Sequence, residues 1–210
     1  MKLLVIIGAG GHGAVVADAA QRAGKWSHIA FYDDRWPVLL ENAGCEVAGN
    51  IEALRQRVAI GWPAQQQLIV ALGANSTRLS LTREFQARGA ELATIVHPTA
   101  VLSASSTIGL GSVVFAGAII NARSAVGLAC IINTGAIVDH DASIAAGTHV
   151  CPGVALAGNV RTGELVTIGI GACVIQGRQI GIRAVVGAGS TVVHDVEADC
   201  TVVGSPARKI

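Results

Sequence analysis

A histidine followed by an aspartate, His140-Asp141, is the pair in this sequence best suited to acid–base chemistry. A carboxylate next to an imidazole orients the ring and raises its basicity, as a general base requires. Neighbours in sequence need not touch, so the segment could instead form a structural turn, for which Asp139 alone would suffice. A second histidine, His149, follows nine residues later. The pair therefore predicts proton transfer, provided that the fold holds it on a rigid, accessible element.

A second candidate site lies near the N-terminus, where Gly8-x-Gly10-x-x-Gly13 follows an apolar run and opens a helical pattern. Glycines let the backbone approach an anion, and a helix N-terminus supplies N–H donors and positive partial charge. Asp33 lies twenty residues beyond Gly13 at a predicted strand end, where an acid can bind a ribose hydroxyl. The pattern indicates a nucleotide site. A dinucleotide, a nucleotide sugar and a glycine turn without ligand all stay open.

The elements around this loop alternate between strand and helix over residues 1–97. Strands are predicted over residues 3–7, 28–32, 68–72 and 92–96, and helices up to Gly24, over 51–58 and over 77–88. Such alternation implies a small parallel sheet, whose ligands bind beyond the carboxyl ends of the strands. The glycine loop, Asp33-Asp34 and Gly73 all fall there. Four strands are about half of a dinucleotide fold, so a nucleotide sugar suits this domain better than NAD.

From Leu102 onward the sequence repeats every six residues. Every sixth residue from Leu102 to Val192 is aliphatic at fifteen of sixteen positions, the exception being Thr162. Gly, Asn or Asp often follows the aliphatic residue, which predicts turns with positive φ there. A period of six fits neither a helix nor an amphipathic strand. It predicts a parallel β-helix of hexapeptide repeats, with eighteen residues in each three-sided coil.

The expected fold is therefore α/β plus all-β: a small Rossmann-like N-terminal domain over residues 1–97, which binds the nucleotide sugar, and a β-helix over residues 98–210. Hydrophobic residues make up 51% of the chain and charged residues only 14%, which excludes a disordered chain. Aromatic residues make up only 3%, fewer than an ordinary core uses. These proportions agree with narrow, repeated packing of small and aliphatic side chains.

The net charge, the hydropathy and the cysteine spacing limit the classes of partner and cofactor that the chain is expected to bind. The net charge is +1 with no basic block, which gives little support to a nucleic-acid partner. No apolar stretch reaches the ~18 residues that a membrane span needs. The five cysteines have no CxxC spacing, so neither a disulfide framework nor a zinc site is indicated. We expect a reduced, cytoplasmic protein without a metal.

Taken together, these motifs resemble those of the NeuD/PglD-like sugar O- and N-acyltransferases of bacteria. Within that group it is similar to the nucleotide-sugar N-acetyltransferases that act on UDP-4-amino-4,6-dideoxy sugars, and to their perosamine counterparts. The residues that carry the resemblance are the Gly8–Gly13 loop with His12, Asp33-Asp34, Gly73, His97-Pro98, Asn133-Thr134, His140-Asp141, His149, Ala157-Gly158-Asn159 and Gly204-Ser205-Pro206-Ala207-Arg208.

The resemblance implies a left-handed β-helix and a homotrimer with acetyl-CoA between neighbouring prisms. His140 would take a proton from the attacking amine, and Asp141 would raise its basicity. For acetyl-CoA, the implied contacts are His149 at the thioester end and the backbone of Ile170 and Ala188 along the pantetheine. For the nucleotide sugar, they are Gly10, Gly11, His12, Asp33, Asp34 and Gly73. Transfer would be direct, without an acyl-enzyme.

Three other functions stay open beside N-acetyl transfer to a UDP-linked amino sugar. An O-acetyltransferase for sialic acid or a polysaccharide would keep the fold, although Asp33-Asp34 favours the nucleotide sugar. A trimeric β-helix zinc hydratase would need three converging histidines, and only His140 and His149 lie near the middle of the prism. A non-catalytic nucleotide-binding scaffold would require that replacing His140 leaves any activity unchanged.

Overall fold

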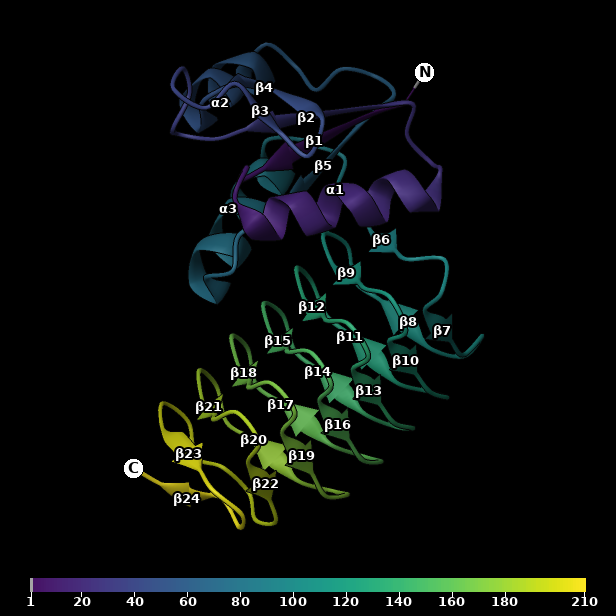
Figure 1. Cartoon of the computed structure of the whole chain (residues 1–210), viewed down its shortest axis with the longest axis vertical. Helices are drawn as coiled ribbons and strands as arrows, with labels where there is room; N and C mark the ends of the chain where they lie inside the picture. The colour runs from purple at the N-terminus through teal and green to yellow at the C-terminus, as the bar shows by residue number, and fades with distance from the viewer. Residues whose placement is uncertain (1) are drawn as a thin grey trace. The chain divides into compact units, whose positions relative to one another are not determined.

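The computed structural model describes residues 2–210 and divides into two compact units, the first ending at Val96 and the second spanning His97–Ile210 (Figure 1). Each unit buries an apolar core of its own. Within residues 2–210, no helix combines the length and the apolar character needed to cross a bilayer.

The first unit is a Rossmann-like sheet with three helices. Its strands lie in the order β3-β4-β2-β1-β5, and all are parallel except β3, which is antiparallel to β4. The central strand is a continuous apolar run with Leu4 to Ile7 fully buried, as in parallel sheets covered on both faces. The bounds are β1 (Leu3–Ile7), α1 (Gly11–Ala23), β2 (His28–Tyr32), β3 (Glu41–Asn42), β4 (Cys45–Gly49), α2 (Ile51–Ala59), β5 (Gln66–Val70), α3 (Asn75–Ala87) and β6 (Ile95–Val96).

Two strand predictions for this unit need correction. The segment predicted as a strand over 92–96 joins the sheet through a single bridge, from Leu92 to Leu68, and the strand predicted over 68–72 begins earlier, at Gln66. The fourth parallel strand is instead β4. Only Val47 and Gly49 of this short strand are buried, so its pattern does not stand out from a loop.

The second unit is a left-handed parallel β-helix of sixteen two-residue strands, β7 to β22, that follow one another every six residues. Each strand ends on one residue of the aliphatic series, here called a rung. Ile119 pairs with Val101 on one side and with Ile137 on the other, eighteen residues away in each direction. Three strands therefore complete one coil, and the predicted fold class is confirmed.

The strands form three faces, which the chain visits in turn. Face 1 consists of β7 (Val101–Leu102), β10 (Ile119–Ile120), β13 (Ile137–Val138), β16 (Ala155–Leu156), β19 (Cys173–Val174) and β22 (Thr191–Val192). Face 2 consists of β8 (Thr107–Ile108), β11 (Ala125–Val126), β14 (Ser143–Ile144), β17 (Arg161–Thr162) and β20 (Gln179–Ile180). Face 3 contains β9 (Val113–Val114), β12 (Ile131–Ile132), β15 (His149–Val150), β18 (Thr167–Ile168), β21 (Val185–Val186) and β23 (Thr201–Val203), with β24 (Arg208–Lys209) antiparallel to β23.

The corners turn at a different residue from the one predicted. Positive φ falls three residues after each rung from Ile108 to Val186, which is every sixth residue from Gly111 to Gly189, and not directly after the rung. The glycines directly after the rungs let successive coils approach each other. A Cβ on Gly169, for example, would lie 2.6 Å from the backbone nitrogen of Ala188 in the next coil. Small size, not a left-handed backbone, explains these glycines.

Thr162, the one polar rung, uses its hydroxyl inside the prism. The side chain is buried, and its Oγ1 accepts a hydrogen bond from the Ala145 backbone N–H at 3.0 Å. The Thr148 hydroxyl lies 3.3 Å away. The Ala145 N–H therefore uses a side-chain hydroxyl, whereas the equivalent N–H of Gly127 donates to the backbone carbonyl of the aliphatic residue Ile144 at 2.8 Å.

We predict that Thr162→Val lowers the free energy of unfolding by about 1–2 kcal/mol, although valine has the same shape and fits the aliphatic series. The loss arises because valine removes the hydroxyl that accepts from the Ala145 N–H in this structure. Urea unfolding followed by circular dichroism measures it. Thr162→Ser keeps the hydroxyl and should lose no more than the ~0.8 kcal/mol of one buried carbon. A valine variant at least as stable as the unmodified protein would contradict this role.

Candidate active site

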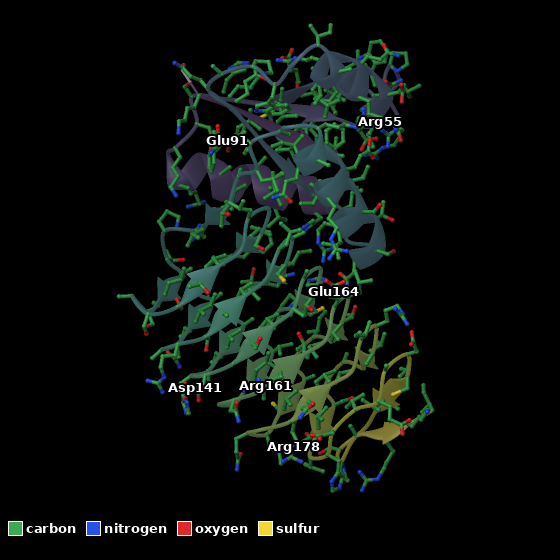
Figure 2. All side chains as sticks on the ribbon, turned by 180° about the vertical axis from the view of Figure 1, so that it is seen from behind. Arg55, Glu91, Asp141, Arg161, Glu164 and Arg178 are labelled. Atoms are coloured by element: carbon green, nitrogen blue, oxygen red, sulfur yellow. The ribbon has the colours of Figure 1, made fainter. Side chains whose placement is uncertain are left out.

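His140 lies at the corner between face 1 and face 2, two residues after the end of β13. Its Nδ1 is 2.7 Å from Oδ2 of Asp141, so the two neighbours in sequence do touch. Asp141 occupies the positive-φ position of the corner, with φ 59°. The imidazole is about half exposed, at 55%, and Figure 2 shows Asp141 on the rim of the stacked coils. The ring is thus held on one side and open to a second molecule on the other.

The preceding coil supplies a cation to this pair. Arg123 stands eighteen residues before Asp141 and donates from Nε to Oδ1 at 2.6 Å and from its terminal nitrogen to Oδ2 at 2.8 Å. Hydrogen bonds from Arg123 first and His140 second hold the pKa of Asp141 far below its usual range. An ionised carboxylate only accepts, so Nδ1 of neutral His140 carries the proton and Nε2 bears the lone pair.

The following coil leaves room for the ring. Gly158 stands eighteen residues after His140, and a Cβ built there would lie 2.6 Å from both Cε1 and Nε2 of the imidazole. The main chain of His140 is held from two directions: its N–H donates to Oδ1 of Asp139 at 2.7 Å, and its carbonyl accepts from Asn159 at 2.8 Å. Oδ1 of Asp139 also accepts from the Asn121 amide at 2.8 Å.

His149 lies on another face, in β15 of face 3. Its Nε2 is 3.0 Å from Nδ2 of Asn133. The amide oxygen of Asn133 accepts from the Thr134 backbone N–H at 2.8 Å, which leaves its amide nitrogen as the donor to His149. The side chain of His149 therefore has a fixed orientation, with Nε2 as an acceptor.

The other two residues predicted to contact acetyl-CoA, Ile170 and Ala188, stack in successive coils at the corner between face 3 and face 1. Both are exposed. Face 1 separates that corner from the one that carries His140, so a single chain does not bring His140 together with His149, Ile170 and Ala188. Among residues 2–210 no group of three or more His, Cys, Asp or Glu side chains is arranged to hold a metal ion.

In the first unit, the glycine loop joins β1 to α1 by a tight turn. Gly8 has φ 102°, and a Cβ on Gly13 would collide with the Gly8 carbonyl oxygen, so only glycine fits at the start of the helix. Cβ atoms on Gly10 and Gly11 would meet nothing within 4 Å. Helix α1 has no side-chain cap at its N-terminus. This geometry fits an anion against the loop.

The two acids after β2 organise the neighbouring loops. Oδ2 of Asp33 accepts from the backbone N–H of Ala9 at 2.7 Å, and Oδ1 accepts from Nε of Arg35 at 2.8 Å. The hydrogen bond with Arg35 is the largest cause that lowers the pKa of Asp33 to about 2. Oδ1 of Asp34 accepts from the Ile51 backbone N–H at 3.1 Å, where α2 begins. Both carboxylates therefore tie a strand end to the element beside it.

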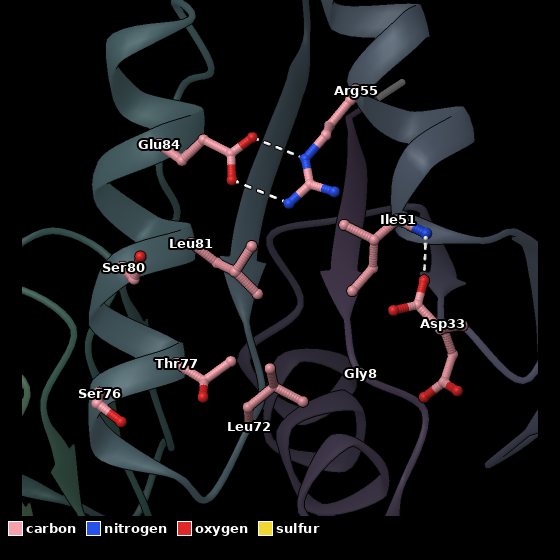
Figure 3. Close-up of a pocket in the computed structure, with 11 residues that line it drawn as sticks. Gly8, Asp33, Ile51, Arg55, Leu72, Ser76, Thr77, Ser80, Leu81 and Glu84 are labelled. Carbon is pink, nitrogen blue, oxygen red and sulfur yellow. Dashed lines mark hydrogen bonds and ion pairs between the residues drawn. The ribbon is translucent and has the colours of Figure 1, made fainter.

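A pocket of about 660 Å³ opens at the carboxyl ends of β1, β2 and β5 (Figure 3). One end is closed by Arg55 of α2 and Glu84 of α3, paired through Nε–Oε1 at 2.7 Å and through the terminal nitrogen and Oε2 at 3.1 Å. Of the residues predicted to bind the nucleotide sugar, Asp33 and Asp34 line the pocket, whereas Gly10, Gly11, His12 and Gly73 do not. The remaining lining residues are Gly8, Ile51, Leu72, Ser76, Thr77, Ser80 and Leu81.

Arg78 is a buried residue that no sequence motif indicates, and its side chain holds the turn after β5 by hydrogen bonds. Its side chain is only 1% exposed and donates to the carbonyl of Leu72 at 2.9 Å, to the carbonyl of Gly73 at 3.2 Å and to Oδ1 of Asn75 at 2.7 Å. Burial first and Arg78 second lower the pKa of His12 to about 4. His12 is therefore uncharged at neutral pH.

The chain is similar in sequence and fold to several known proteins. Residues 3–85 match the family model described as the PglD N-terminal domain. The acetyltransferase domain of PglB from Neisseria gonorrhoeae is 38% identical, with a TM-score of 0.92 and complete coverage of both chains. A histidine variant of perosamine N-acetyltransferase from Caulobacter crescentus, in complex with CoA and GDP-perosamine, is also 38% identical, with a TM-score of 0.92 over 100% of this chain and 97% of that one.

The chain belongs to the NeuD/PglD-like family of sugar acyltransferases. Its predicted family membership is thus confirmed. UDP-N-acetylbacillosamine N-acetyltransferase from Bacillus subtilis is 35% identical over 113 residues, which are 54% of this chain. Serine acetyltransferase from Synechococcus elongatus is 53% identical over 45 residues. The matched segments span only 51% and 18% of these two curated relatives.

For this NeuD/PglD-like acyltransferase, we predict that Gly158→Ala lowers kcat of acetyl transfer by about tenfold or more. The new methyl group would displace the imidazole of His140, the predicted general base, and misplacement of a reacting group by about 1 Å costs up to ~100-fold. Release of CoA from acetyl-CoA in the presence of an acceptor sugar measures the rate. In a His140→Ala background the same change should cost nothing further. An equal proportional loss in both backgrounds would contradict the proposed contact.

We also predict that His12 makes the first unit acid-sensitive. Because its pKa falls from 6.5 to about 4 on folding, the unfolded chain binds the extra proton between these values, and stability declines as pH drops from 6.5 to 4. The decline amounts to up to about 3 kcal/mol. All three tryptophans, Trp26, Trp36 and Trp62, lie in this unit, so urea unfolding followed by tryptophan fluorescence reports on it.

His12→Gln should flatten this dependence on pH, whereas His28→Gln, at an exposed histidine of the same unit, should leave it in place. If the His12 variant retains the full slope between pH 6.5 and 4, another group carries the effect and the role of His12 is wrong.

Proposed function

We propose that this chain transfers the acetyl group of acetyl-CoA to the amino group of a nucleotide-linked 4-amino-4,6-dideoxy sugar. The observation that carries the proposal is the His140–Asp141 pair on the rim of a β-helix, in a chain that matches an N-acetyltransferase solved with CoA and GDP-perosamine over its full length. We further propose that the sugar is UDP-linked. The glycine loop with Asp33-Asp34 supports a nucleotide sugar. The name of the relative from Bacillus subtilis, UDP-N-acetylbacillosamine N-acetyltransferase, indicates a UDP-linked sugar.

In this reaction, Nε2 of His140 accepts a proton from the sugar amine as the amine nitrogen attacks the thioester carbonyl carbon. The C–N bond forms, the C–S bond then breaks, and the imidazolium returns the proton to the CoA sulfur. Asp141 stays ionised and stabilises the imidazolium through Nδ1. Because the nucleophile must be a free amine, positioning it beside the thioester supplies several kcal/mol of the barrier reduction.

The acetyl-CoA site is proposed to lie between adjacent chains of a homotrimer. His149, Ile170 and Ala188 would contact acetyl-CoA on one chain and His140 would face it from the neighbour. Outward side chains on face 1 support this packing, because they are mostly apolar and face 2 carries mostly polar ones. On face 1 they are Val101, Ile119, Ile137, Ala155, Cys173 and Thr191, and on face 2 Thr107, Ala125, Ser143, Arg161 and Gln179.

The nucleotide is proposed to lie in the first unit, with its phosphates against Gly10 and Gly11 at the start of α1. Neutral His12 can act there as a hydrogen-bond donor without adding charge. The pocket lined by Asp33 and Asp34 would take the base and ribose, beside the turn at Gly73. A cytoplasmic location, where acetyl-CoA and nucleotide sugars are made, stays a prediction.

We predict that CoA is released from acetyl-CoA with a UDP-linked 4-amino-4,6-dideoxy sugar and that His140→Ala lowers kcat by about 10²–10⁴-fold. A panel of the UDP-linked sugar, its GDP-linked counterpart and free sialic acid, assayed by thiol release, measures both statements. His194→Ala is the matched control, because His194 is an exposed histidine of the same β-helix that plays no part in the proposed site.

Each outcome of the panel decides one part of the proposal. Turnover with the GDP sugar alone would keep N-acetyl transfer and correct the nucleotide. Turnover with sialic acid alone would replace the proposal by O-acetyl transfer. Undiminished activity of the His140 variant would overturn the assignment of the base.

A further inference from the structure

Arg123 contacts Asp141 but has no role in the reaction proposed above. Residues Ser105, Arg123, Asp141 and Asn159 occupy the same corner position in four successive coils, since they are spaced by eighteen. The backbone N–H of Arg123 donates to Oγ of Ser105 at 3.1 Å, and its guanidinium donates to both oxygens of Asp141. Oδ2 of Asp141 therefore accepts from Arg123 and from His140 together.

We propose that Arg123 is a positioning residue that orients the Asp141 carboxylate toward His140 and at the same time limits the basicity of His140. The proposal rests on the proposed function, in which His140 is the general base. It assigns to Arg123 no contact with either substrate.

The orienting part follows from the two-pronged geometry. A guanidinium that donates from two nitrogens to two carboxylate oxygens fixes the plane of the carboxylate, which a single contact would leave free to rotate. With that plane fixed, Oδ2 of Asp141 stands 2.7 Å from Nδ1 of His140 and selects the tautomer with the lone pair on Nε2. The Arg123 side chain is 66% exposed, and exposed ion pairs add little to folding stability.

The limiting part follows from charge. A carboxylate at hydrogen-bond distance favours the imidazolium, and a cation on the same carboxylate opposes it. A base that is too basic is already protonated at the working pH and cannot accept a proton. The other charged groups around this corner are Asp139, bound to Asn121 and to the His140 backbone, and Arg161 of the next coil, whose terminal nitrogen is 3.5 Å from the Asn159 amide oxygen. None of these is altered when Arg123 is replaced.

Arg123→Gln should move the His140 titration midpoint, followed by the Cε1–H signal in NMR of the full chain, to higher pH by about 0.5–1. The acid limb of the pH profile of kcat/KM should move by the same amount, and kcat on the plateau should fall by about tenfold. Arg123→Lys keeps the positive charge but cannot donate from two nitrogens to both carboxylate oxygens. It should leave the midpoint within about 0.3 of the unmodified protein while still lowering kcat.

The matched control is Arg183→Gln. Arg183 makes the same two-pronged contact with an exposed aspartate, Asp199, at a corner between face 2 and face 3. It should change neither the His140 titration nor the pH profile. An unchanged or lowered midpoint in Arg123→Gln, or an equal shift in Arg183→Gln, would overturn the proposal. A fully active His140→Ala variant would instead overturn the proposed base, and the NMR titration would still report on Arg123.

Discussion

The eighteen-residue coil is the constraint on which the second unit depends. Backbone hydrogen bonds between coils lock each residue over the one eighteen positions away, as Ile119 is locked to Val101 and Ile137. The interior is then so narrow that only one aliphatic rung per strand fits, and glycine is required where the next coil passes closest. The stacking also determines the surroundings of His140: within this unit, the side chains beside it come from its own corner or from the corner one coil before or after.

The two units position their polar groups by different means. In the β-helix, an exposed imidazole is oriented by contacts within one corner column, with Asp141 beside it, Arg123 before it and bare backbone at Gly158 after it. In the sheet, loops that end neighbouring strands hold each other, as Asp33 does when it accepts from the glycine loop at Ala9. The first arrangement is rigid because coils stack. The second relies on side chains that cross between loops.

Because the two units position their polar groups differently, the sequence predicts one better than the other. The six-residue repeat and the His140-Asp141 pair can be recognised directly in the sequence. The spacing of eighteen residues also relates Arg123 to Asp141 and Gly158 to His140, but the sequence alone does not predict what Arg123 and Gly158 do. Arg78 and the Arg55–Glu84 pair join elements that no repeat relates, so nothing in the sequence marks them. The residues with positive φ differ from those that the sequence predicts, because glycine, a common turn residue, here allows close packing of successive coils.

The same rigidity bears on how the proposed site can be completed. His140 stands at one edge of face 1, and Ile170 and Ala188 stand at the other. A loop could swing to join two such groups, but a prism whose every coil is hydrogen-bonded to the next cannot bend one corner onto another. If these residues act in one reaction, the missing half must come from a second copy placed against face 1. The apolar outward side chains of that face, among them Ile119, Ile137 and Ala155, make it the surface on which such a copy would pack.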